Sequence, residues 1–113
     1  MSARSMVGAV AIALSLAFAH GAAAGGKAEA GKAKAAQVCA ACHGTDGAKP
    51  SAPDQPILAG QYYDYLVKAM TDYKSGKRNN AIMKGFAEKL SLQDMEDLAA
   101  WFSSQKSSLH FQR

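Results

Sequence analysis

Both cysteines of the chain fall within one pentapeptide, Cys-Ala-Ala-Cys-His at residues 39–43. Two cysteines separated by two residues are typical of three kinds of site: a redox-active dithiol, half of a zinc site, and the anchor of a covalently attached haem. Each kind requires a different structure around the cysteines. The choice between them therefore constrains the fold more than any other feature of the sequence.

An uncharged and mostly apolar stretch occupies residues 6–19 and follows a basic residue, Arg4. Small residues come next, which completes the order of a secretory signal peptide. A membrane anchor is the competing interpretation, but a bilayer core needs about 20 apolar residues and this stretch is shorter. We expect a cleaved signal peptide over residues 1–24, or one ending at Ala19, and a single domain over residues 25–113 in the periplasm, with no stable membrane insertion.

The charges of the chain are scattered and nearly balanced. Its 13 Lys and Arg residues and 9 Asp and Glu residues give a formal net charge of +4. No dense basic run with interleaved aromatic residues occurs, so we expect no nucleic-acid partner. The length of 113 residues suits one small domain, whose modest core would gain from a bound cofactor.

The sequence on either side of the cysteines argues against two of the three sites. A loop as short as Cys39 to Cys42 gains little from a structural disulfide, although export favours disulfides in general. Thioredoxin-type dithiols follow a strand and precede a helix, whereas here an Ala- and Lys-rich helical stretch precedes the motif and a Gly- and Pro-rich loop follows it. Structural zinc needs four ligands, and the only further Cys or His after residue 24 is His110, near the end of the chain.

The histidine that follows the second cysteine favours the haem anchor. In the motif Cys-x-x-Cys-His the two thiols form thioethers with the haem vinyl groups, and the histidine ligates the iron from the proximal side. We therefore predict that Cys39 and Cys42 bind haem c covalently and that His43 ligates its iron. A coincidental histidine beside a disulfide is the alternative. The chain contains one such motif, which predicts one haem per chain.

The second axial ligand has four candidates: Met70, Met83, Met95 and His110. Met70 belongs to an apolar stripe with helical spacing over residues 60–75, which predicts a core position. Ser91 is expected to be the N-cap of the last helix and to form a variant of the capping box with Asp94. Met95 then pairs with Leu90 as a hydrophobic staple, which gives it a structural place. His110 lies in a short tail where helix ends fray.

Met83 stands in a different context, because residues 74–90 contain two glycines and two adjacent asparagines and have no long periodic face. We expect this segment to form a loop with at most a short turn over residues 81–89. A loop can carry a thioether to the distal face of the haem, so we predict Met83 as the distal ligand, with Met70 as the substitute. Filling a gap beneath the loop is the alternative role of Met83.

With these ligands in place, the chain resembles the class I cytochromes c, in particular the small bacterial periplasmic ones and single halves of the di-haem cytochrome c-four group. The resemblance covers residues 31–105. Gly31 matches the glycine at which the first and last helices of that family cross, and Leu98 and Trp101 match the positions that meet it. The resemblance implies an all-α cytochrome c fold with three main helices wrapped around one covalently bound haem.

Two further segments carry the resemblance. Pro-Ile-Leu-Ala-Gly-Gln from Pro56 matches the family's Pro-x-Leu-x-Gly-Gln segment, which implies that the carbonyl of Pro56 accepts the Nδ1 proton of His43. Gly-Lys-Arg-Asn-Asn-Ala-Ile-Met, ending at Met83, resembles the family's Gly-x-Arg-x-Asn-x-x-Met stretch, which again implies that Met83 is the distal ligand. Because Arg78 and Asn79 lie close to Met83 in the sequence, we expect them to bond the haem propionates.

The helices are expected over residues 27–42, 60–75 and 91–106. The side chains that we expect around the haem are apolar or aromatic: Ile57, Leu58, Tyr62, Tyr65, Leu66, Ile82, Phe86, Leu98 and Phe102.

Function follows from the predicted ligands. A haem with both axial positions filled by His43 and Met83 leaves no open site for a substrate, and a thioether ligand raises the reduction potential. We predict a periplasmic one-electron carrier that cycles between Fe(II) and Fe(III) and is not an enzyme. The alternatives are a haem-bearing subunit of a periplasmic dehydrogenase or oxidase complex, and a five-coordinate gas-binding or enzymatic haem protein.

The expected partners are redox proteins, both donors and acceptors, with acidic docking patches, and the chain is expected to be a monomer. Six cations are candidates for a positive rim that steers these partners, with a plain solubility surface as the alternative: Lys49, Lys68, Lys74, Lys77, Arg78 and Lys84.

Overall fold

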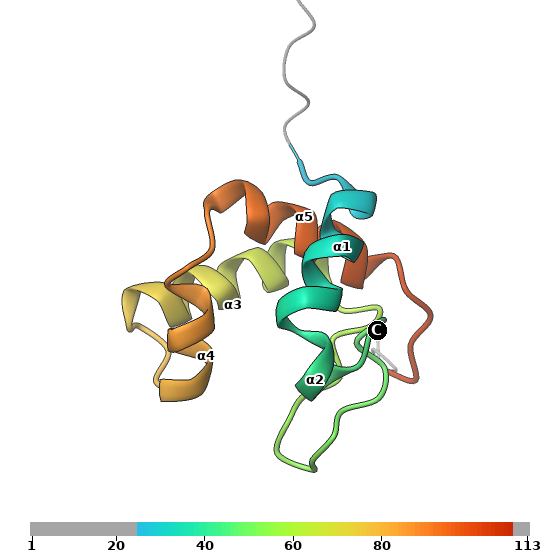
Figure 1. The fold of residues 1–113 in the computed structure, drawn as a ribbon, viewed down its shortest axis with the longest axis horizontal. Coiled ribbons are helices and arrows are strands. Elements are labelled where there is room, and N and C mark those ends of the chain that lie inside the picture. Colours follow the sequence, from blue (N-terminus) through green and yellow to red (C-terminus); the bar gives the residue numbers. More distant parts are fainter. Residues whose placement is uncertain (1–24, 110–113) are drawn as a thin grey trace, which may run out of the picture.

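Helices and connecting loops make up the part of the chain that the computed structural model describes, residues 25–109, and no strand occurs among them (Figure 1). The prediction of an all-α fold is therefore confirmed. The predicted signal peptide and His110 lie outside the described residues. The helices are α1 (Ala28–Val38), α2 (Ala40–His43), α3 (Tyr63–Ser75), α4 (Ala81–Ala87) and α5 (Leu92–Ser103).

Helices α1 and α5, from the two ends of the domain, pack closely against each other (Figure 1). A Cβ atom added at Gly31 would lie 1.9 Å from the carbonyl oxygen of Asp97 and 2.9 Å from the Cβ of Trp101. Only glycine permits this approach, as the resemblance implied. The indole Nε1 of Trp101 also donates to the carbonyl of Thr45 at 2.9 Å, so the crossing of the two helices also fixes the segment that follows the cysteine motif.

The start of α5 carries the capping box that its sequence predicts. The Ser91 hydroxyl accepts from the backbone N–H of Asp94, and the Asp94 carboxylate accepts from the backbone N–H of Ser91, both at 3.0 Å. The bond from the Ser91 backbone, together with weaker contributions from its side chain and Lys34, lowers the pKa of Asp94. Leu90 and Met95, on either side of the cap, are 7% and 2% exposed, which confirms the hydrophobic staple and the core position of Met95.

The predicted helix over residues 27–42 is wrong in one respect, because it consists of two helices. Cys39 separates α1 from α2 with φ −112° and ψ −30°, a larger negative φ than helical residues adopt. The backbone N–H of His43 donates to the carbonyl of Cys39 at 3.0 Å and begins a new turn. The break therefore falls at the first cysteine of the motif.

The two other long helices are shorter than predicted. Helix α3 begins at Tyr63 rather than at residue 60, because Gly60 adopts a positive φ of 74° and its N–H donates to the carbonyl of Phe102 at 2.9 Å. Helix α5 ends at Ser103 rather than at residue 106. The short turn predicted over residues 81–89 is a helix, α4, over Ala81–Ala87.

A compact apolar cluster joins α1, α3 and α5, and α4 packs against α3. Its buried members are Ala35, Leu66, Leu90, Met95, Leu98, Ala99 and Phe102. Within residues 25–109, none of the helices has the length and apolar character needed to cross a membrane. Helices α2 and α4 lie apart from each other in the lower half of the view, with α3 and α5 above them (Figure 1).

Candidate functional site

His43, the last residue of α2, is almost completely buried, with 6% of its surface exposed. Its Nδ1 lies 2.9 Å from the carbonyl oxygen of Pro56. A carbonyl oxygen only accepts hydrogen bonds, so Nδ1 carries a proton, and in the neutral ring Nε2 then has the free lone pair. The ring is thus held in the tautomer that a metal ligand needs.

The loop between α2 and α3 is folded so that Pro56 returns to His43. The side-chain oxygen of Gln55 accepts from the backbone N–H groups of Ser51 and Ala52, both at 3.0 Å, and from the Ser51 hydroxyl at 2.8 Å. Further along, the carbonyl of Gly47 accepts from Leu58 N at 2.8 Å. These bonds explain how a loop rich in proline and glycine holds one carbonyl in a defined place.

Cys39 and Cys42 are half-buried, have free thiols, and lie on the wall of the same cavity as His43. Burial, with a smaller contribution from Cys42, raises the pKa of Cys39 to about 11. This thiol stays protonated near neutral pH, whereas the nucleophilic cysteine of a redox dithiol has a lowered pKa. The environment of Cys39 therefore does not favour the dithiol interpretation.

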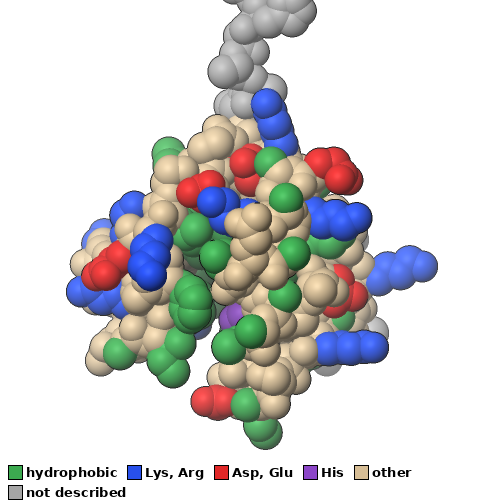
Figure 2. All heavy atoms as spheres, in the orientation of Figure 1, with side chains coloured by type: hydrophobic (Ala, Val, Ile, Leu, Met, Phe, Trp, Pro, Cys, Tyr) green, Lys and Arg blue, Asp and Glu red, His purple; other side chains and the backbone are tan. Residues whose placement is uncertain are grey.

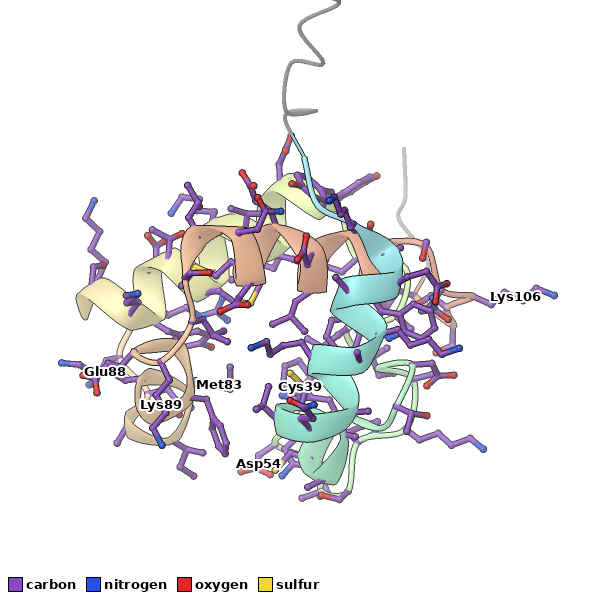
Figure 3. All side chains as sticks on the ribbon, turned by 45° about the horizontal axis from the view of Figure 1, so that its top comes forward. Cys39, Asp54, Met83, Glu88, Lys89 and Lys106 are labelled. Carbon is purple, nitrogen blue, oxygen red and sulfur yellow. The ribbon has the colours of Figure 1, made fainter. Side chains whose placement is uncertain are left out.

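Met83 lies on α4, so the expectation that a loop carries it is wrong. Asn80 is the N-cap of α4, and its side-chain oxygen accepts from the backbone N–H of Met83 at 3.0 Å. Such a cap stabilises the first turn of a helix, and this turn includes Met83. Figure 3 shows Met83 and Cys39 on opposite sides of the gap between α4 and the α1–α2 pair.

One cavity of about 540 Å³ brings these residues together. Cys39, Cys42, His43 and Met83 all line it, and most of its remaining wall is apolar or aromatic. In Figure 2 it is visible as a hollow between two lobes, with hydrophobic side chains on both sides and a histidine within. Eight of the nine predicted packing residues line it; the exception is Tyr62, which is 61% exposed.

Met70 also lines the cavity, while it packs against the apolar core. Met70 therefore contacts the core, as predicted, and also borders the cavity. Met95 does not line the cavity; its Sδ lies 3.7 Å from the hydroxyl of Thr71. Of the three methionines in the described part of the domain, Met70 and Met83 thus remain as thioethers that border the cavity.

Arg78 and Asn79 both reach the cavity wall. The guanidinium of Arg78 donates from Nη1 to the hydroxyl of Tyr65 at 3.1 Å and lies 4.8 Å from the centre of the Tyr73 ring. The hydrogen bond to Tyr65 is the main cause that raises the pKa of Arg78. Arg78 is thus a fixed cation at the edge of the cavity.

Sequence reasoning missed several residues of the cavity wall, including Gln61, Tyr73 and Asn80. Tyr73 belongs to the apolar stripe of α3 and has no separate signal. Asn80 has one, because an asparagine three residues before the end of an Ala-Ile-Met run is at N-cap spacing from Met83.

Some of the predicted rim cations have partners on their own surface. Lys68 pairs with Asp72, Lys84 lies 3.9 Å from Glu88, and the Lys74 ammonium donates to the carbonyl of Leu90. Exposed pairs of this kind contribute little to stability, but they lower the local positive charge beside α3 and α4. Lys74 in particular ties α3 to the segment that joins α4 and α5.

Comparison with known proteins places this arrangement in a family. The family model described as cytochrome c matches residues 28–106. The chain belongs to the cytochrome c family. Membership implies a covalently bound haem c, and the donors on the cavity wall suit that group: two free thiols, an imidazole with its second nitrogen already bonded, and a thioether.

Individual relatives refine the comparison. This cytochrome c is 56% identical over 86 residues to cytochrome c4 of Pseudomonas aeruginosa, and the match covers 76% of this chain and 42% of the relative. It is 40% identical over 73 residues to the thiosulfate dehydrogenase electron acceptor of Thiomonas intermedia, which covers 65% of the chain and 34% of the relative. The crystal structure of reduced cytochrome c4 from Pseudomonas stutzeri matches with a TM-score of 0.67 at 47% identity, over 74% of this chain and 48% of that one. This cytochrome c thus spans less than half the length of these relatives, and it resembles one half of the di-haem cytochrome c4.

Proposed function

We propose that the chain is a one-electron carrier in which a single haem c is bound through Cys39 and Cys42 and ligated by His43 and Met83. The observation that carries this proposal is the meeting of a prepared imidazole and a thioether, from two separate helices, on the wall of one apolar cavity. When bound, the haem supplies a reversible one-electron change between Fe(II) and Fe(III).

The chain's own residues determine how that change proceeds. Pro56 holds the Nδ1 proton of His43, which keeps the ring oriented and raises the basicity of Nε2. The thioether of Met83 is a soft ligand that favours the ferrous state. The apolar walls exclude water, and exclusion of water also favours the less charged state. If His43 and Met83 both held the haem iron, the site would be suited to electron transfer and not to bond chemistry.

Arg78 and Asn79 are proposed to bond the haem propionates. Both line the cavity, and Tyr65 and Tyr73 hold the guanidinium of Arg78 in place. A fixed guanidinium is well suited to a carboxylate. Each chain would hold one haem, because it contains one Cys-x-x-Cys-His motif.

Export and partners complete the proposal. Residues 1–24 are proposed to direct a monomeric domain over residues 25–113 to the periplasm. The relative named as a thiosulfate dehydrogenase electron acceptor supports a dehydrogenase as one class of donor. Partners with acidic docking patches are proposed to meet the predicted rim cations, among them Lys49, Lys77 and Arg78, of which Arg78 lines the cavity.

Spectroscopy of the purified haem protein tests the ligand set. Ferric protein is expected to show the weak red charge-transfer band of sulfur-to-iron ligation, and ferrous protein is expected not to bind carbon monoxide at neutral pH. Rapid binding of carbon monoxide by the wild-type protein would contradict the carrier function and favour a five-coordinate haem protein.

A further inference from the structure

We infer that Asn80 is a positioning residue for the distal ligand: its side chain caps α4 and thereby keeps Met83 on the iron. The inference rests on the proposed function, because it assumes that Met83 ligates the haem. Met83 is the third residue of α4, and its backbone N–H donates a hydrogen bond to the side-chain oxygen of Asn80 at 3.0 Å. Asn80 therefore acts on the backbone from which the thioether extends.

Helix α4 depends on this cap because it has few other sources of stability. It has only seven residues, and Ala87 is the one buried among them. Ile82 is 69% exposed, and Gly85 lies inside the helix, where glycine costs about 1 kcal/mol relative to alanine. An isolated helix of this length would not form in water, so packing against α3 and the Asn80 cap must hold it.

The energetic link between cap and ligand can be measured. An external ligand such as imidazole binds the ferric iron only when Met83 has left it, so its apparent affinity is proportional to the fraction of protein in which Met83 is released. Loss of an N-cap costs about 1 kcal/mol, which corresponds to about a fivefold change in an equilibrium constant. The apparent imidazole affinity of Asn80→Ala is therefore expected to rise about fivefold.

Two variants test the sign and the mechanism. Asn80→Ser keeps a side-chain oxygen that can cap the helix, and it is expected to restore the wild-type imidazole affinity. Gly85→Ala should lower that affinity about fivefold by stabilising α4, since a Cβ atom at Gly85 meets no atom within 4 Å. Gly85→Ala also keeps the inference testable if Asn80→Ala fails to fold.

Ser91→Ala is the matched control. Ser91 caps α5 with the same 3.0 Å bond to the third residue of its helix, but α5 carries no proposed ligand. Loss of the Ser91 cap should lower the melting temperature and leave the imidazole affinity unchanged. If the role of Asn80 were merely structural, Asn80→Ala would give the same outcome as Ser91→Ala.

The measurement uses the haem-loaded ferric protein, titrated with imidazole and followed by the red sulfur-to-iron band. If the wild-type protein lacks this band, the proposed function fails. If the wild-type protein has the band and Asn80→Ala or Gly85→Ala binds imidazole as the wild type does, the inference about Asn80 is overturned while the proposed function stands.

Discussion

Three of the residues that would hold the haem are each kept in place by a neighbouring residue. His43 is oriented by Pro56 in the following loop, and the backbone of Met83 is held by Asn80. Arg78 is held by Tyr65 and Tyr73 of α3. A substitution at one ligand therefore removes that ligand and leaves these supporting contacts in place. We expect it to change the haem spectrum before it changes the global fold.

Substitutions of Met83 and Met70 distinguish between these two candidates for the distal ligand. Met83→Ala should open the distal position and lower the reduction potential by on the order of tenths of a volt, within the roughly 0.8 V that axial ligands span. Met70→Ala should lower stability and leave the potential close to that of the wild type, because Met70 packs against the core as well as the cavity. A redox titration of both variants measures the difference. The reverse result would assign the distal ligand to Met70.

Single residues show which parts of the site could be predicted from the sequence. Cys39, Cys42 and His43 stand in one contiguous motif, so their spacing alone predicts their common site. The sequence context of Met83 was enough to predict it as a ligand. The helix that carries it could not be predicted, because a seven-residue segment containing Gly85 shows no periodic pattern. The contact between Pro56 and His43 came from family resemblance, since no spacing rule predicts that a loop carbonyl returns 13 residues later.

At the scale of helices, the crossing of α1 and α5 is the contact that allows least change. The break at Cys39 was missed because alanines continue the helical pattern through the motif. By contrast, the capping box at Ser91 was predictable because it is local. A local signal thus predicted the start of α5, whereas a tertiary contact, from Gly60 to Phe102, accompanies the later start of α3 at Tyr63.

Gly31→Ala tests this crossing. The added methyl group would lie 1.9 Å from a backbone oxygen of Asp97, which cannot rotate away, so α1 and α5 would have to separate. We expect a loss of about 3 kcal/mol in the free energy of unfolding, measured by denaturant titration of the haem protein.

Gly85→Ala is the control for Gly31→Ala, because the same change meets open space at that position. It should leave the stability equal to or above that of the wild type. A Gly31→Ala protein as stable as the wild type would contradict the close crossing of the two helices.

At the scale of the whole molecule, the cavity takes the place that a larger core would occupy. Residues of the apolar cluster, among them Leu66, Leu98 and Phe102, also border the cavity. Their packing is therefore completed by whatever fills it. The two lobes in Figure 2 meet above the hollow and are separated below it, so the filled cavity is also expected to hold α4 in register with α1 and α2.

Removal of both anchors tests this dependence. The double variant Cys39→Ser and Cys42→Ser should lose its cooperative thermal transition and its near-ultraviolet circular dichroism and keep part of its helical signal, as loosely packed states do. Ala36→Ser and Ala41→Ser together provide a control, because both alanines are exposed and the same number of hydroxyl groups is introduced. An unchanged transition in the cysteine variant would show that the chain folds without a covalent cofactor.

The packing of the first helix against the last also has a consequence for the order of events in the cell. Helix α1 ends before the cysteine motif, and its partner α5 ends at Ser103, so α1 has no α5 to pack against until synthesis has passed that residue. Contacts between such distant segments form slowly. During that interval Cys39 and Cys42 would stand on an unpaired helix end, where both thiols would be accessible for the proposed attachment of haem. The topology of the chain would then allow haem attachment to precede the final packing of α1 against α5.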